Sequence, residues 1–146
     1  MTDRSQFKVP KSPTEMTHGM VWLPRMLDKI RLHAQGQLSQ EYIDNLGIGF
    51  DGRCCRFLRI EYEALVDRVQ QGGDDEEILE WCFESGRRLS DEDIEVWNGF
   101  ISKRGWRDSP SVVEGLEQTK RASGLGHRKD ILTFFHFDDV DEGRDG

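Results

Sequence analysis

The sequence predicts an all-α fold, a compact single-domain bundle of about six to seven short helices. Most segments repeat apolar residues with the helical period, and glycine, proline or capping residues separate one segment from the next. Only one segment alternates as a strand would, and no second candidate strand is present to pair with it. We expect residues 1–19 to form an extended basic arm and residues 20–146 to form one helical domain with an acidic C-terminal tail.

The arm contains Pro10, Pro13 and few apolar residues, and Arg4, Lys8 and Lys11 make it locally basic. This composition is typical of a disordered segment, which we favour over an arm that wraps the domain.

Residues 20–36 form the clearest helix. Pro24 suits the first helical position, and Gly36 supplies the left-handed stop. The apolar face, spaced at about 100° per residue, consists of Leu23, Met26, Leu27, Ile30 and Ala34. Because Leu23 is a poor N-cap, the N–H groups of the first turn need another acceptor, which can be water, the chain itself or a ligand.

A short helix over residues 39–45 is expected next, followed by a glycine-rich connection. A glycine-rich loop before a helix can hold a phosphate, but this one lacks the Lys-Ser/Thr pair of a phosphate-binding loop. We interpret it as a turn in which Asp51 can cap the following helix.

One continuous helix over residues 52–71 would place Glu61 in the middle of its apolar face. A buried, unpaired carboxylate is costly, whereas a carboxylate near a helix N-terminus is favourable. We therefore predict a break near residues 59–61, with one helix over about 52–58 and a second over about 61–71.

The remaining helices have clear start signals. Residues 74–77 place acidic side chains at one helix start, Ser90 and Asp93 resemble a capping box, and Asp108-Ser109-Pro110 begins a third helix. Residues 130–137 alternate as in a strand, but an isolated strand would leave its backbone groups unsatisfied. We predict a buried helix there.

The composition narrows the classes of function. A net charge of -8 argues against a nucleic-acid partner, because affinity for phosphate comes mainly from cations. No apolar run approaches the roughly 20 residues needed to cross a bilayer, and residues 1–17 hold no segment typical of a signal peptide. Three cysteines do not make a disulfide framework. We expect a soluble cytoplasmic protein with no membrane partner, and the sequence predicts no oligomeric state.

Several motifs occur together along nearly the whole chain. They are Leu-Pro-Arg-Met-Leu-Asp-Lys at residues 23–29, the segment 57–69, Asp-Glu-Glu-Ile-Leu-Glu-Trp at residues 75–81, Trp97-Asn98, and Asp-Glu-Gly-Arg at residues 141–144. In combination they resemble an uncharacterised bacterial family, known only as a domain of unknown function. The resemblance implies a small all-helical domain and no established activity. Relatives often carry glycine where Arg59 stands here, which agrees with the predicted helix break.

The charged face of the opening helix is the first candidate ligand-binding site. Arg25, Lys29 and Arg31 surround Asp28 and can clamp a carboxylate or phosphate, with Asp28 orienting the arginines. Uncapped N–H groups nearby would add to such an anion site. Surface ion pairs are the simpler interpretation, and the one that we favour.

Two further candidates carry a thiol or an aromatic ring. Cys55 lies near a helix start between two arginines, conditions that lower a thiol pKa, although a reactive thiol is the less favoured alternative. Trp106 and Arg107 suit stacking on a planar or anionic ligand. We favour instead a helix end with the tryptophan tucked into the core. The four histidines show no metal-ligand spacing, so neither a metal nor a cofactor is predicted.

The acidic residues 138–142 suggest a specific hypothesis. This tail can dock on the basic face, or on the uncapped start, of the opening helix and so bring Arg144 to the same region.

The leading functional hypothesis is a non-catalytic helical domain that binds a small anionic molecule or another protein, because no catalytic constellation is recognisable. The alternative is an enzyme that acts on a small anionic metabolite in a cleft lined by Arg25, Asp28, Arg31 and Cys55. A third class is an adaptor that dimerises through exposed aromatic residues.

Overall fold

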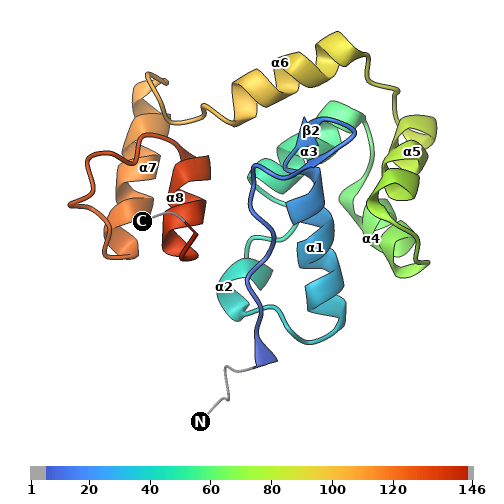
Figure 1. Ribbon diagram of the computed structural model, residues 1–146, viewed down its shortest axis with the longest axis horizontal. Coiled ribbons are helices and arrows are strands. Elements are labelled where there is room, and N and C mark those ends of the chain that lie inside the picture. The colour runs from blue at the N-terminus through green and yellow to red at the C-terminus, as the bar shows by residue number, and fades with distance from the viewer. Residues whose placement is uncertain (1–5, 145–146) are drawn as a thin grey trace.

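A computed structural model describes residues 6–144 of the chain, and within this range eight helices and one two-stranded hairpin are present. The elements are β1 (Met16–Thr17), β2 (Met20–Val21), α1 (Leu23–Ala34), α2 (Gln40–Ile43), α3 (Phe50–Leu58), α4 (Tyr62–Gln70), α5 (Asp75–Ser85), α6 (Asp91–Ile101), α7 (Pro110–Ala122) and α8 (Phe134–Asp141) (Figure 1). The predicted all-α class is confirmed in outline. The expected number of six to seven helices is too low for the described residues, and the hairpin was not predicted.

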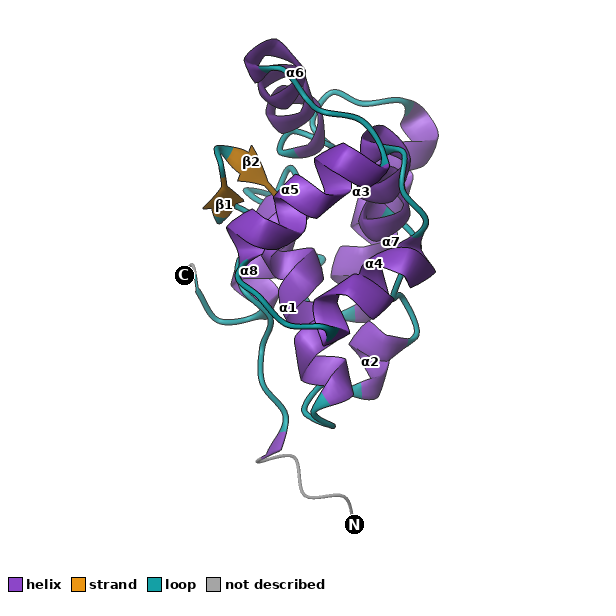
Figure 2. Cartoon of the chain, turned by 90° about the vertical axis from the view of Figure 1, so that its right-hand side faces the viewer, coloured by secondary structure: helices purple, strands orange, loops and turns teal. Residues whose placement is uncertain are grey.

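Within the stretch 20–36 that the sequence predicted as a helix, Met20 and Val21 belong to the hairpin and α1 begins at Leu23, next to the predicted first helical residue Pro24. Met16 pairs with Val21 and Thr17 with Met20, across a turn in which His18 and Gly19 both have positive φ. Positive φ at both central residues is the geometry that suits a two-residue hairpin turn. The strands form only a small element beside the helices (Figure 2).

Asn98 and Trp97 on α6 explain why β2 holds its place. The Asn98 amide accepts from the N–H of Val21 at 3.0 Å and donates to the Gly19 carbonyl at 2.7 Å. The Trp97 indole donates to the Val21 carbonyl at 3.0 Å. Since these contacts join residues far apart in the sequence, local patterns carry no signal for them.

The predicted break between α3 and α4 is confirmed. α3 ends at Leu58, Arg59 adopts a left-handed conformation with φ 61°, and Glu61 is the N-cap of α4. The chain therefore makes the break without glycine, at some conformational cost. Glycine is instead required at Gly86, where a side-chain carbon would collide with the Leu58 carbonyl that accepts from the N–H of Arg87.

The predicted helix starts are also confirmed for α5, α6 and α7. Asp74 with Glu77, and Ser90 with Asp93, form complete capping boxes. α7 begins at Pro110. For residues 130–137 the helix prediction is correct only in part, because α8 begins at Phe134 and continues to Asp141.

The described part of the N-terminal arm, residues 6–19, lies against the domain. Pro10, Ser12 and Pro13 are buried, and the N–H of Lys8 donates to the Gln37 carbonyl at 2.8 Å. This is the wrapped alternative and not the disordered one that the sequence favoured. Residues 1–5, which the predicted arm includes, lie outside the described residues.

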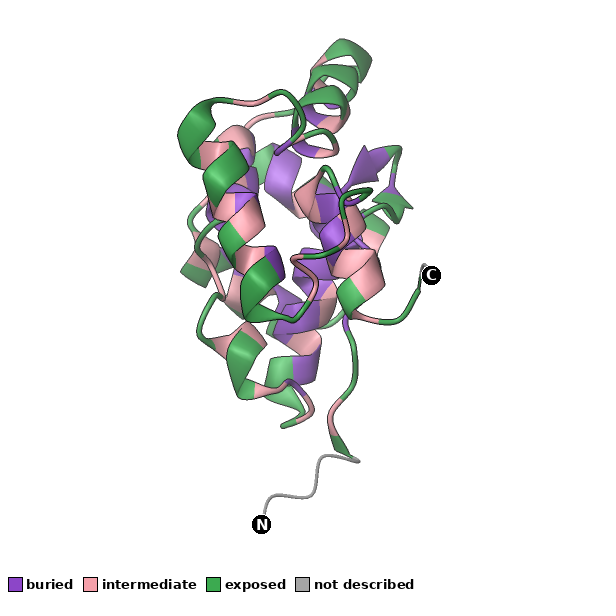
Figure 3. Ribbon diagram, turned by 90° about the vertical axis from the view of Figure 1, so that its left-hand side faces the viewer, coloured by how far each residue is buried: buried purple, intermediate pink, exposed green. Residues whose placement is uncertain are grey.

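Apolar side chains gather in two cores of unequal size. The large core joins the hairpin, α1 and α3 to α6, and it includes Phe135 of α8. The small core consists of Leu116, Ile131 and Phe137, with Leu125, Phe134 and Val140 packed against it. α7 and α8 lie to one side of the molecule, and α6 spans the distance between them and α5 (Figure 1); the buried residues lie on the inner faces of the helices (Figure 3). Among the described residues, no helix is long and apolar enough to cross a membrane.

Candidate functional site

The basic side chains of α1 are buried. Arg25 is 3% exposed and Lys29 is 6% exposed, so the favoured interpretation of surface ion pairs is wrong for these two residues. A buried charge is costly unless it is paired and hydrogen-bonded, and each of these side chains meets a carboxylate. Leu32, which interrupts the charged face in the sequence, is also buried.

Arg25 forms a two-point ion pair with Glu142, at the end of α8. Its Nη1 and Nη2 atoms donate to the two Glu142 oxygens at 2.8 and 2.7 Å. The Tyr42 hydroxyl donates to the same carboxylate at 2.7 Å, and Nη1 also donates to the Lys11 carbonyl at 2.9 Å. Burial opposes ionisation of Glu142, but the bonds from Arg25 and Tyr42 outweigh it and lower the pKa of this carboxyl.

The predicted docking of the acidic tail on the opening helix is therefore confirmed. Arg144 reaches the same region, where its guanidinium pairs with Asp139 and Glu142 and donates to the Pro10 carbonyl. The tail thus connects α1, α2 and the N-terminal arm around one buried carboxylate.

Lys29 pairs with Asp51, a residue that the sequence analysis interpreted as a helix cap. Its ammonium donates to Asp51 at 3.0 Å, and Asp51 also accepts from the Trp22 indole at 3.0 Å and from the N–H of Gly47 at 3.2 Å. Asp51 is 1% exposed and lies inside the first turn of α3, whose N-cap is Gly49. The expectation that Asp51 caps this helix is wrong, because its carboxylate is used in the interior.

Asp28 and Arg31 do not join Arg25 and Lys29 in one anion clamp. Asp28 accepts from the backbone N–H of Lys11 at 3.0 Å. Arg31 donates to Asp75, at the start of α5, at 2.6 Å. The carboxylate partners of Arg25, Lys29 and Arg31 thus lie on three different elements, and Asp28 pairs with the N-terminal arm.

Cys55 lies in conditions opposite to those expected. The thiol is buried, and burial, together with the nearby Asp51 carboxylate, raises its pKa to about 12. A thiolate is the reactive form, so this environment makes Cys55 inert near neutral pH. Cys54 is fully buried.

Trp106 is not tucked into the core as expected. The side chain is 47% exposed, and the guanidinium of Arg107 lies 5.2 Å from its ring centre. Neither residue lines the cavities next to α1.

A cleft lies between α1 and α2 on one side and α7 and α8 on the other. Its volume is about 500 Å³. It is lined by Trp22, Arg25, Lys29, Glu41, Tyr42, Asn45, Ile48, Gly49, Phe50, Thr119, Phe134, Phe137, Asp138, Asp141 and Glu142. Of the predicted site residues, only Arg25 and Lys29 line it.

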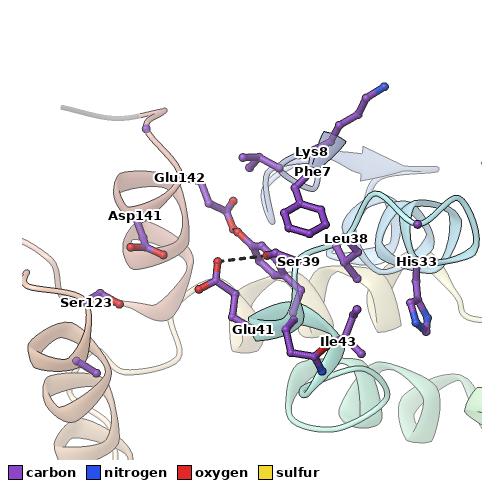
Figure 4. A pocket seen from close by; sticks show the side chains of 16 residues that line it. Phe7, Lys8, His33, Leu38, Ser39, Glu41, Ile43, Ser123, Asp141 and Glu142 are labelled. Carbon is purple, nitrogen blue, oxygen red and sulfur yellow. Dashed lines mark hydrogen bonds between the residues drawn. The ribbon is translucent and has the colours of Figure 1, made fainter. Parts of the chain in front are cut away.

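A larger groove of about 1200 Å³ adjoins this cleft and shares Glu41, Tyr42, Asp141 and Glu142 with it. Figure 4 shows Asp141 on one side of the groove, and Glu41 and Phe7 across from it; the dashed line is the bond from the Ser39 hydroxyl to Glu41. Glu142 thus lines both the cleft and the groove.

Two carboxylates of the cleft have raised pKa values. Burial raises the pKa of Asp138 to about 7, against the attraction of Arg25 and with the help of the negative charge on Glu142. Burial also raises the pKa of Asp141, and Glu142 and Glu41 add to the rise. Residues 6–144 contain no group of three or more His, Cys, Asp or Glu side chains placed to hold a metal ion.

A family model described as "Domain of unknown function (DUF5069)" matches residues 7–144, nearly the whole chain. No curated protein matches the sequence.

Proposed function

We propose that this chain, which belongs to the DUF5069 family, is a small-ligand-binding domain whose ligand occupies the cleft between α1 and α8. The observation that carries the proposal is the cleft itself. Its volume of about 500 Å³ lies within the range of small-molecule sites, and its walls combine aromatic rings with a few ionisable groups.

A small anion, the ligand that the sequence suggested, fits this cleft poorly. Arg25 and Lys29 already hold Glu142 and Asp51. An anion would have to displace one of these carboxylates and leave it unpaired in the interior, which is costly. The geometry favours a ligand that uses the aromatic walls and the remaining polar groups.

The enzyme alternative loses its proposed constellation. Asp28 and Arg31 contact other partners, and Cys55 is a buried thiol with a raised pKa. Of that set, Arg25 alone lines the cleft. A non-catalytic binding role does not require Asp28, Arg31 or Cys55 to line the cleft.

A protein partner is a second candidate function, and one observation favours it. Val96 and Phe100 on α6, together with Trp106, are large apolar side chains with 60%, 39% and 47% of their surface exposed. Exposed aromatic residues are typical of interaction surfaces. A cytoplasmic location belongs to the same proposal, and the three free cysteines of the chain support it.

A thermal-shift screen with amines, amino acids, carboxylates, phosphates and neutral aromatics tests the proposed function. A ligand present at about 100 times its dissociation constant adds about 2.7 kcal/mol to the free energy of unfolding. Thr119→Phe should abolish the shift, because Thr119 lines the cleft and the larger ring would fill it. Gln118→Phe, at an exposed position of the same helix, is the matched control and should keep the shift. An equal shift in both variants would place the ligand elsewhere and contradict the proposal.

A further inference from the structure

We infer that the ligand of this cleft carries an organic cation, such as an ammonium group, and that Asp138 is its counter-charge. The inference rests on the proposed function and names the chemical class of the ligand. It follows from the charges that line the cleft, the position of Asp138, and the aromatic walls beside it.

The charges of the cleft do not balance. Its lining contains two cations and four carboxylates: Arg25 and Lys29, and Glu41, Asp138, Asp141 and Glu142. Arg25 is hydrogen-bonded to Glu142. Lys29 is hydrogen-bonded to Asp51, a buried residue that does not line the cleft. Three carboxylates remain around the same space to which no cation of residues 6–144 is hydrogen-bonded, namely Glu41, Asp138 and Asp141.

Asp138 has the strongest need for a cation. Its side chain is 21% exposed, and within residues 6–144 its one ion pair is with Arg25, at 3.8 Å between Oδ2 and Nη2. That nitrogen already donates to Glu142 at 2.7 Å. Lys29 also attracts the Asp138 charge, while Glu142 and Asp139 repel it. A cation from outside would offset this repulsion and provide hydrogen-bond donors, which the described part of the chain does not supply to the Asp138 side chain.

The walls of the cleft suit such a group. Phe50 and Phe134 line it with their rings 5.7 Å apart, in an edge-to-face arrangement. The protein already contains one ammonium in this setting: Lys29 lies 4.9 Å from the centre of the Trp22 ring and is held by Asp51. A cation between Asp138 and the phenylalanine rings would repeat this combination of ring and carboxylate.

The separation of the carboxylates favours an organic cation over a metal ion. Within the described part of the chain, no three acidic, histidine or cysteine side chains converge at metal-ligand distance. An ammonium group needs only one close carboxylate, and the apolar part of the molecule can lie against the rings.

Three probes with the same ring and different charge test the inference on the full chain: benzylamine, benzyl alcohol and benzoate. Binding is measured by NMR titration at pH 8, with Ca²⁺ and Mg²⁺ as further arms. We expect benzylamine to bind at least about tenfold more tightly than the other two probes, because only its ammonium pairs with Asp138. Equal affinity of benzylamine and benzyl alcohol, or tighter binding of benzoate or of either metal ion, would overturn the inference.

Asp138→Asn supplies the second readout. It should remove the preference for benzylamine over benzyl alcohol. In the natural chain, benzylamine should bind about tenfold more weakly at pH 6 than at pH 8, because the pKa of Asp138 is about 7 and the amine stays protonated throughout. This difference should vanish in Asp138→Asn, and its persistence would contradict the role of Asp138. Asp141→Asn, at the exposed mouth of the cleft, should weaken benzylamine binding less.

The two proposals fail in distinguishable ways. If benzyl alcohol or benzoate binds as well as benzylamine, and Thr119→Phe abolishes that binding, the cleft is a ligand site and only the cation inference is wrong. If benzylamine does not bind at all, the cation inference is overturned, and the wider thermal-shift screen decides separately whether the cleft binds another class of molecule.

Discussion

The two sides of the cleft differ in how they are held together. The hairpin, α1 and α3 to α6 share one continuous apolar core. Within residues 6–144, α7, α8 and the segment between them form a separate core of only three buried apolar residues, Leu116, Ile131 and Phe137. A pair of helices with so small a core does not fold by itself, because the apolar area buried is too small to offset the conformational entropy lost.

α8 therefore depends on the larger body through a few contacts. Phe135 belongs to the large core and stacks on Trp22 with ring centres 5.9 Å apart. Glu142 is held by Arg25, and the N–H of Phe134 donates to the Arg104 carbonyl at 3.1 Å. The cleft lies along the seam, by which we mean the boundary between α8 and the larger body. The contacts that hold α8 in place therefore also set the width of the proposed binding site.

The largest expected effect is the loss of a central side chain from the large core. Trp97→Ala should lower the free energy of unfolding by about 3–5 kcal/mol, because the ring is 2% exposed, stacks on Phe57 and bonds to the Val21 carbonyl. Urea denaturation followed by circular dichroism measures the change. Amide exchange should quicken in both regions, since α7 and α8 cannot remain folded without the larger body. Loss of protection confined to α6 would contradict this dependence.

Breaking the buried ion pair between Arg25 and Glu142 should lower the free energy of unfolding somewhat less than Trp97→Ala does. Its first effect should be local opening of α8. Arg25→Met leaves the buried Glu142 carboxylate with the partly exposed Arg144 as its cation, and we expect a loss of about 3 kcal/mol. Exposed pairs contribute about 0.2–1 kcal/mol, so Arg88→Met, which breaks the exposed pair with Glu80, is the matched control. Amide exchange should locate the opening at α8 in Arg25→Met alone. Equal destabilisation by the two variants would show that burial adds nothing to the Arg25–Glu142 pair.

The sequence predicted the parts of this fold that local chemistry determines. The capping residues of α5 and α6 lie within four residues of the groups that they satisfy, so they are visible as motifs. The break at Arg59 followed from the cost of burying Glu61. The docking of the acidic tail followed from two complementary charge runs, although its geometry did not.

The candidate site was harder to predict because its contacts are long-range. Glu142 lies 117 positions from Arg25, and Asp51 lies 22 positions from Lys29. No periodic pattern distinguishes a buried, paired cation from an exposed one, so Arg25 and Lys29 were expected at the surface. Asp51 was missed for a similar reason: an acidic residue near a helix start is usually a cap. The one available signal was the nearby Trp22, whose indole needs an acceptor when it is buried.

The small core should respond to truncation more locally than the large one. Leu116→Ala removes a residue that is 2% exposed, and we expect a loss of about 2–3 kcal/mol. The loss should lie at the low end for a buried leucine, because α7 is at the edge of the molecule and can relax toward the cavity. Amide exchange should quicken in α7 and α8 while α1 and α3 to α5 stay protected. The affinity for any ligand of the cleft should fall together with this local stability. If α1 lost protection equally, the two regions would form one cooperative unit, and the comparison would fail.

The smallest expected effect is the dependence of stability on the Asp138 charge. Because the pKa of Asp138 in the folded chain, about 7, lies above its value of about 3.9 in an unfolded chain, the protonated form is favoured by folding. The stability that Asp138 contributes is therefore fully present at low pH and is lost as the pH rises from about 4 to about 7. Asp138→Asn removes this titration, so the variant should gain about 1–2 kcal/mol relative to the natural chain between pH 6 and pH 8. Urea denaturation at the two pH values measures the gain, with Asp67→Asn, at an exposed position of α4, as the control. Equal behaviour of the two variants would mean that Asp138 already has an adequate counter-charge in the free protein, which would remove the reason for a cationic ligand at the seam.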